Sequence, residues 1–297
     1  MSEPDPIAET ITARLASLQA GGRLSAWSLI VSFLGDAIGP RGGVVSAGTL
    51  QAVMQRLGIG AGAVRTAISR LSADGWIERS REGRNSFYRL SGDVEETVHA
   101  AERRIYAASS LLPADAPRSL VIAAEPLSEQ TLASLEPAGA LQLAPQLILC
   151  FVAAADLPDG LRLPGATLAG LSRLEPGDAM RARLAEARHF ADFEELRAAY
   201  EPLRTALQQQ PGSPPPVDAM ALRCLMIHEW RRLALRVPAI PADLVEPGDP
   251  EPETRALIAA IYARLLPASE AWLDADATTP SGPLPPPDAR LAARFGV

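Results

Sequence analysis

The chain shows its organisation most clearly in residues 61–90, which read AGAVRTAISRLSADGWIERSREGRNSFYRL. Four apolar residues recur there at helical spacing and form one stripe: Val64, Ala67, Ile68 and Leu71. Asp74-Gly75 ends this predicted helix. Two β-prone runs, residues 76–80 and 86–90, then flank a basic turn. The pattern predicts a helix followed by a two-stranded hairpin.

The face of this helix opposite the apolar stripe is small and polar, which suits close approach to base edges in the major groove of DNA. Arg65 is the candidate for bidentate pairing with guanine. Thr66 and Ser69 could reach bases or phosphates, and Arg70 on the flank is better placed for backbone phosphate. The residues of this candidate surface are Gly62, Arg65, Thr66, Ser69 and Arg70.

The hairpin supplies a second candidate surface, which would follow phosphates or a narrow minor groove and carry little base information. Its residues are Arg79, Arg81, Arg84, Asn85 and Ser86. A helix with two arginines, or a basic hairpin tip, often occurs in proteins that never bind nucleic acid. Both features together, in this order, predict DNA binding.

The elements before residue 61 complete the motif. Residues 7–20 have a helical stripe and predict a leading arm, and Ser25 can cap a helix through residue 38. Val44-Val45 is a short β-prone piece, after which Ser46 can cap a helix through residue 57. Helix, short strand, helix, turn, helix and hairpin is the order of a winged helix-turn-helix.

The charge distribution agrees with a separate DNA-binding segment. The formal net charge of the 297 residues is −7, and all 28 cationic side chains are arginine. Residues 23–90 contain nine arginines and four acidic residues, a net charge of +5, whereas residues 91–297 contain 18 arginines and 28 acidic residues, a net of −10. A basic module is therefore attached to an acidic body.

The remainder predicts a globular, cytoplasmic protein. A helix is expected at 94–112, short strands with one helix-like segment at 128–136 in residues 119–180, and helices at 178–209, 217–237 and 252–273, followed by a poorly ordered tail. Two cysteines, Cys150 and Cys224, fit a reducing compartment. The longest apolar stretch has nine residues, too few to span a membrane. No metal site, cofactor or enzymatic motif is expected.

Several of these stretches resemble the PaaX family, bacterial repressors of phenylacetate catabolism. The resemblance covers about residues 23–106, including 28–36, 64–71, 74–76 and 82–90, and extends to Arg104-Ile105-Tyr106. A second signature lies in residues 227–238 with Leu244. The middle domain departs from the family, because residues 117–139 contain one arginine and no tryptophan.

The resemblance implies an α+β multidomain protein with a winged helix-turn-helix, a small ferredoxin-like middle domain and a helical C-terminal domain used in dimerisation. The expected divisions are residues 1–93 for the DNA-binding domain with its arm, 94–117 for the connection, 118–177 for the middle domain, 178–277 for the helical domain and 278–297 for the tail. It also implies an acyl-CoA effector, phenylacetyl-CoA in the namesake, that releases the repressor from DNA.

The pair Arg231-Arg232 beside His228 has three interpretations: ion pairs at a domain contact, a structural signature of the family, or a phosphate clamp for a CoA-type ligand. The structural interpretation ranks first, and the candidate effector residues are His228, Arg231 and Arg232. His228-Glu229 begins like a zinc-protease helix, but Arg232 stands where the second histidine would be needed.

We therefore expect a homodimeric repressor that binds a pseudo-palindromic double-stranded DNA operator of a catabolic operon and is released by an aryl-acyl-CoA. Two alternatives stay open. One is a scaffold whose winged helix binds protein without DNA or ligand switching, and the other is a nuclease of the middle domain.

Overall fold

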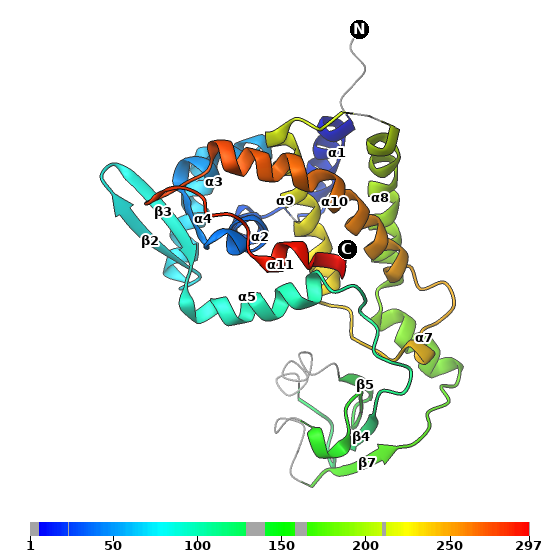
Figure 1. The fold of residues 1–297 in the computed structure, drawn as a ribbon. Helices are drawn as coiled ribbons and strands as arrows, with labels where there is room; N and C mark the ends of the chain where they lie inside the picture. Colours follow the sequence, from blue (N-terminus) through cyan, green and yellow to red (C-terminus); the bar gives the residue numbers. More distant parts are fainter. Residues whose placement is uncertain (1–5, 23, 129–139, 158–164, 210–211, 297) are drawn as a thin grey trace. The chain divides into compact units, whose positions relative to one another are not determined.

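A computed structural model describes residues 6–22, 24–128, 140–157, 165–209 and 212–296. The chain divides into two compact units. The first comprises residues 1–108, 195–232 and 253–297, and the second residues 109–194 and 233–252. Each unit is an α+β assembly, as expected from the sequence (Figure 1).

The N-terminal part of the first unit begins with two helices, α1 (Pro6–Ala20) and α2 (Ala26–Phe33). Ser25 caps α2, since its hydroxyl accepts a hydrogen bond from the backbone N–H of Ser28. The helix continues into a π-helical turn at Leu34–Ile38, which contains Asp36. The apolar side chains of α2 are buried, as the sequence periodicity predicted.

Helices α3 (Ala47–Arg56) and α4 (Ala61–Ala73) pack with α2. Strand β1 (Val44–Ser46) precedes α3, and β2 (Ile77–Glu82) and β3 (Asn85–Leu90) form the predicted hairpin after α4. The three strands make one antiparallel sheet in the order β1-β3-β2. In Figure 1 the hairpin extends past the helices at one end of this unit.

The same unit contains helix α5 (Gly92–Ile105) and most of α8 (Phe190–Gln209), α9 (Pro216–Ala234) and α10 (Glu251–Asp276). Residues 219–230 of α9 are all buried, which explains why the sequence there is mostly apolar. The expected division places residues 1–93 and 178–277 in different domains. In the structure most of both ranges shares one compact unit, and the buried ion pairs Arg223–Asp36 and Arg14–Glu229 join them.

The prediction of a poorly ordered tail is wrong. Residues 278–296 form a short hairpin, β8 (Thr278–Thr279) with β9 (Gly282–Pro283), followed by α11 (Ala289–Ala292) and a 3₁₀ turn at Arg294–Gly296. Leu291, Arg294 and Phe295 are buried. The burial of these three side chains therefore fixes a segment that its position at the end of the sequence made look poorly ordered.

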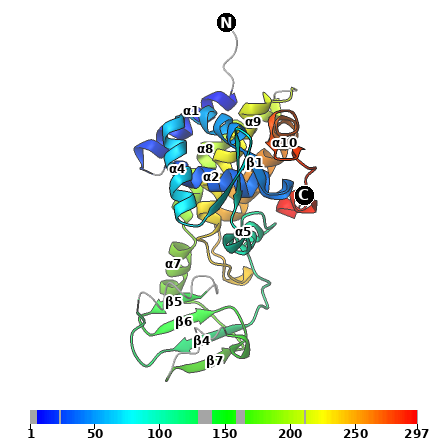
Figure 2. The same cartoon turned by 90° about the vertical axis from the view of Figure 1, so that its left-hand side faces the viewer.

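The second unit is built on four strands: β4 (Arg118–Ile122), β5 (Leu141–Ala144), β6 (Leu147–Cys150) and β7 (Thr167–Leu171). The order is β5-β6-β4-β7, and each pair is antiparallel (Figure 2). Val121 and Ile148 belong to the apolar cluster on one face. Leu149 on the other face packs in a cluster with Leu184 of α7 (Asp178–Ala187).

The single helix expected at 178–209 is two helices, because His189 between α7 and α8 adopts φ +52°, which is incompatible with a continuous helix. The helix-like segment expected at 128–136 lies almost wholly outside the described residues.

Helix α10 is long and apolar enough to span a membrane by length and composition, the one such helix in the described part of the chain. Half of its most apolar 18-residue window is buried inside the protein, which is ordinary for a core helix. No group of three or more His, Cys, Asp or Glu suited to a metal ion lies within the described ranges.

Candidate nucleic-acid interface

Helix α4 presents its predicted polar face to solvent. Its buried residues include Val64, Ala67 and Leu71, and every candidate residue on the other side is exposed: Gly62, Arg65, Thr66, Ser69 and Arg70. A side chain added at Gly62 would meet nothing within 4 Å, so this face is open. The Thr66 hydroxyl donates to the Gly62 carbonyl over 3.1 Å, which leaves its oxygen free to accept.

The hairpin positions the second candidate surface. Arg79, Arg81, Arg84 and Asn85 are exposed and Ser86 is half-buried. The guanidinium of Arg79 donates from Nε and Nη2 to Ser86 Oγ at 3.2 and 2.7 Å, which holds these two side chains across the strands. Gly83 at the tip has φ +58°, a conformation that glycine adopts without strain.

The electrostatics of this basic segment separate two kinds of arginine. Among its described arginines, Arg41 pairs with Glu270, Arg56 with Asp218 and Arg89 with Glu78. The structure records no ion pair with any described residue for the five others, and all five lie on α4 or the hairpin: Arg65, Arg70, Arg79, Arg81 and Arg84. Their charge is therefore available to an anionic partner.

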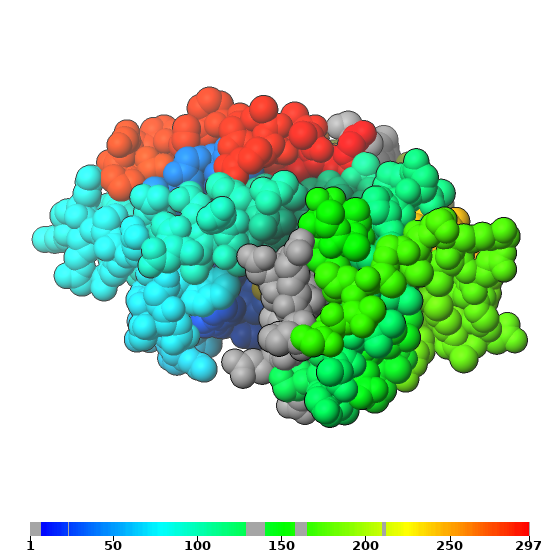
Figure 3. All heavy atoms as spheres, turned by 90° about the horizontal axis from the view of Figure 1, so that it is seen from below, coloured from blue at the N-terminus to red at the C-terminus, as the bar shows by residue number. Residues whose placement is uncertain are grey.

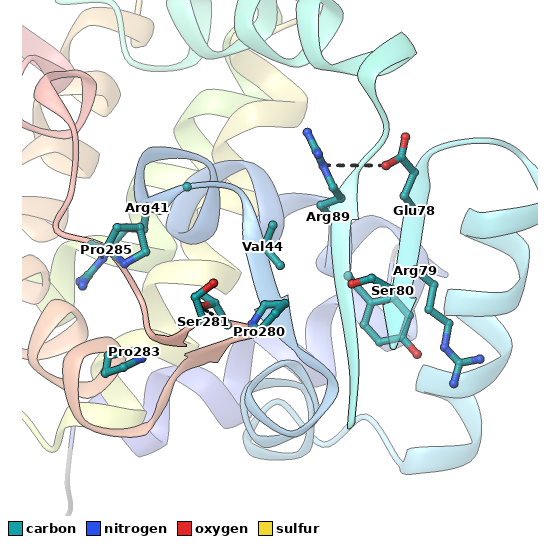
Figure 4. A pocket seen from close by; sticks show the side chains of 13 residues that line it. Arg41, Val44, Glu78, Arg79, Ser80, Arg89, Pro280, Ser281, Pro283 and Pro285 are labelled. Atoms are coloured by element: carbon teal, nitrogen blue, oxygen red, sulfur yellow. Dashed lines mark hydrogen bonds and ion pairs between the residues drawn. The ribbon is translucent and has the colours of Figure 1, made fainter. Parts of the chain in front are cut away.

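The C-terminal hairpin supports the sheet that carries this surface. A cavity of about 630 Å³ lies between the sheet and residues 279–285, lined by Arg79, Glu78 and Ser281 among others (Figure 4). Figure 4 shows Arg89 and Glu78 side by side on neighbouring strands, 4.0 Å apart. A Cβ at Gly42 would come within 2.9 Å of Pro285, and Gly42 has φ +83°, so glycine is required at this contact.

The candidate effector residues lie against α2. His228 is fully buried, with its Nδ1 3.5 Å from Ser28 Oγ and 3.4 Å from Ser32 Oγ. Arg231 donates from Nε to Ser32 Oγ over 2.7 Å and from Nη2 to the carbonyl of Ser28 over 3.2 Å. Arg232 is exposed. The contacts of Arg231 hold it to α2, and the effector-binding role of the three residues stays a prediction.

The environment of His228 gives a testable pH dependence. Burial and the charges of Arg231 and Arg232 lower the pKa of His228 from 6.5 to about 3. Below pH 6.5 the unfolded chain therefore takes up a proton that the folded chain does not. Between pH 7 and 5 this histidine should remove about 2 kcal/mol of stability.

Urea denaturation of the wild type and of His228→Gln at both pH values measures this effect. Between pH 7 and pH 5 the free energy of unfolding should fall by about 2 kcal/mol less in the variant than in the wild type. This difference does not depend on the stability of the variant at pH 7. Equal losses in the two proteins would contradict the assignment of a neutral, buried imidazole.

Sequence reasoning missed a buried charged cluster that joins α2 to the C-terminal helices and tail. Asp36 is at its centre, because its carboxylate accepts from Arg223 Nε and from Arg294 Nη1, each over 2.8 Å. It also accepts from the hydroxyls of Tyr106 and Tyr262 at 2.5 and 3.0 Å. Burial alone would raise the pKa of Asp36, but the charges of Arg223 and Arg294 outweigh it and hold this pKa below its ordinary value.

Comparison with known proteins agrees with this architecture. The family model described as PaaX-like protein matches residues 25–94, and the PaaX-like protein C-terminal domain matches residues 185–275. The transcriptional repressor PaaX of Escherichia coli (strain K12) is 32% identical over 292 residues, which is 92% of this chain and 90% of that protein.

A solved structure shares the fold. The uncharacterized protein Rv0674 from Mycobacterium tuberculosis matches with a TM-score of 0.50 and 18% sequence identity, over 83% of this chain and 98% of that one. Two matching domain models and a full-length relative above 30% identity establish the family. The chain belongs to the PaaX-like proteins, a family of transcriptional repressors and not of enzymes.

Proposed function

We propose that this protein represses transcription by binding a DNA operator through a winged helix-turn-helix formed by residues 25–90. The observation that carries the proposal is the placement of five arginines, none with an ion pair to a described residue, on α4 and the hairpin, in the basic segment of an acidic protein. The order of helices and strands in this segment supports the same motif. The repressor role of the E. coli relative supports the function.

In this proposal α4 enters the major groove and the hairpin follows the adjacent backbone. Arg65 pairs with guanine, and Gly62, Thr66 and Ser69 allow close approach and further polar contacts. Arg70 binds phosphate from the flank. The hairpin contacts are supplied by Arg79, Arg81, Arg84, Asn85 and Ser86.

The acidic body completes the regulator. The strand order β5-β6-β4-β7 supports a ferredoxin-like second unit. We propose a cytoplasmic homodimer, because one recognition helix reads too few bases to be selective, whereas two half-sites multiply the discrimination. We further propose that an aryl-acyl-CoA such as phenylacetyl-CoA lowers operator affinity by binding one arrangement of the protein better than the other.

Selection of tight-binding duplexes from a random-sequence DNA pool tests the proposal. We expect one enriched, pseudo-palindromic motif whose half-sites are centred about 10 base pairs, or a multiple of this, apart. Adding phenylacetyl-CoA to the complex of the protein with this motif should weaken binding.

The outcomes are separable. A pool without an enriched motif contradicts sequence-specific binding, and a motif without two-fold symmetry contradicts the symmetric dimer on DNA. Unchanged operator affinity at millimolar phenylacetyl-CoA removes this effector from the proposal.

A further inference from the structure

A second cavity, of about 670 Å³, lies in the first unit between α5 and the C-terminal tail. Figure 3 shows these two segments side by side, with α5 in teal and the tail in red. None of the residues that line the cavity belongs to the predicted DNA-binding surface. It therefore offers a site that operator DNA would leave accessible.

The lining of the cavity is amphipathic and positively charged. Ala107, Ala108 and Ala293 contribute apolar wall, and Tyr106 also lines the cavity. Three arginines, Arg103, Arg290 and Arg294, also line it, against the single carboxylate of Glu102. Such a cavity is complementary to a ligand with an apolar body and a negatively charged group.

The arginines differ in how far they are already engaged. Arg294 donates to Glu102 over 2.6 Å and to Asp36 over 2.8 Å, so it is held by the protein. Arg290 contacts Asp288 at 2.8 Å and Glu102 at 3.3 Å, and its side chain is 40% exposed. Arg103 is exposed, and no ion pair to another described residue is recorded for it. Arg103 is thus the cation best able to meet a ligand's negative charge.

The cavity is connected to the elements proposed to read DNA. Helix α5 follows β3 directly, and Ser91 between them is tied to the turn after α4, since its hydroxyl donates to the Gly75 carbonyl and its N–H to the Trp76 carbonyl. On the other side, Glu102 and Tyr106 of the cavity reach Asp36 of the α2 extension, the former through Arg294. A ligand that moves α5 against the tail must therefore strain contacts on both sides.

We propose that this cavity, in place of His228, Arg231 and Arg232, is the effector site and that it binds an amphipathic anion, either an arylacetic acid or its coenzyme A thioester. The inference rests on the proposed function, which supplies the effector but not its place. Because binding at two coupled sites is reciprocal, the factor by which the ligand weakens operator binding equals the factor by which operator weakens ligand binding.

Calorimetric titration of the full chain with phenylacetyl-CoA, phenylacetate and coenzyme A tests the site. Arg103→Glu reverses the free charge, and Ala293→Phe fills the cavity from an exposed position. Each variant should lower the affinity of the bound probe at least tenfold while operator affinity without ligand stays within twofold. Arg183→Glu, the same charge reversal at an exposed arginine of α7 outside the cavity, is the matched control and should change neither affinity.

The results test separately whether the cavity is the effector site and whether phenylacetyl-CoA is the effector. If phenylacetyl-CoA binds the wild type and both cavity variants equally, the cavity is not the effector site, although the effector itself stands. If only phenylacetate binds, and the variants lose it, the cavity stands and the thioester effector is wrong. If none of the three probes binds the wild type, both are overturned. Ligand binding without any effect on operator affinity would overturn the coupling.

Discussion

Replacing Arg65 and Arg84 together by alanine should lower operator affinity by at least about 100-fold, which corresponds to about 2.7 kcal/mol. Arg65 is assigned to a base edge, where one bidentate contact contributes about 1–3 kcal/mol of discrimination. Arg84, at the hairpin tip, is assigned to phosphate, and its loss should also make binding less dependent on salt. Both side chains are exposed, so their removal leaves the fold intact.

Fluorescence anisotropy with the selected operator at several salt concentrations measures both effects. The double variant Arg173→Ala/Arg183→Ala, two exposed arginines of the second unit, is the control for overall charge and should change affinity little. Arg65→Lys alone should retain salt dependence but relax the preference for guanine, since lysine cannot form the bidentate pair. Operator affinity within twofold of wild type in the Arg65/Arg84 variant would contradict the assignment of these two arginines to DNA contacts.

The parts of the structure that depend on residues close together along the chain could be predicted from the sequence. The apolar stripe of α4, the hairpin around Gly83 and the caps at Ser25 and Ser46 are local patterns, and the structure contains all of them. The exposure of Arg65 and Arg84 also follows from local periodicity, because residues opposite an apolar stripe face solvent. The elements carrying the candidate interface could therefore be predicted from the sequence.

The charged cluster could not be predicted, because its members are distant along the chain and belong to no periodic pattern. Asp36 and Arg294 are 258 residues apart, and Asp36 and Arg223 are 187 apart. In the sequence, Arg294 looks like one more cation in a proline-rich tail. Only the packed structure shows that it is buried and that it fixes this tail. The same reason explains why the helices of residues 178–277 looked like a separate domain.

Asp36→Ala should lower the free energy of unfolding by about 3–5 kcal/mol, because it removes one partner of a buried ion pair and leaves the other charge uncompensated. Arg223 and Asp36 are almost fully buried, with side-chain exposures of 0% and 1%, and Arg294 is 2% exposed. The total free energy of unfolding of most natural domains is about 5–15 kcal/mol, so the loss is large enough to reduce the folded fraction at 37 °C. Urea denaturation followed by circular dichroism measures it.

Glu253→Ala provides the matched control, because Glu253 pairs with Arg197 over a comparable 2.8 Å but both side chains are well exposed, at 71% and 44%. It should cost less than about 1 kcal/mol. If Asp36→Ala does not fold, Asp36→Asn keeps the size of the side chain and removes only its charge, which allows the loss to be measured. A loss in Asp36→Asn no larger than in the control would contradict the central role of this carboxylate.

A triple variant separates two quantities: the free energy that the charged cluster contributes relative to apolar side chains, and the free energy lost when one charge is removed from it. Replacing Asp36 by leucine and both Arg223 and Arg294 by methionine leaves no lone charge from these three residues. Glu270 and Glu102 each lose one arginine partner but keep another, Arg41 and Arg290 respectively. Because apolar replacement of buried ion pairs is often neutral or stabilising, the triple variant should recover part of the stability lost in Asp36→Ala. A triple variant as unstable as Asp36→Ala would instead show that these charges, and not merely their pairing, hold α2 to the tail.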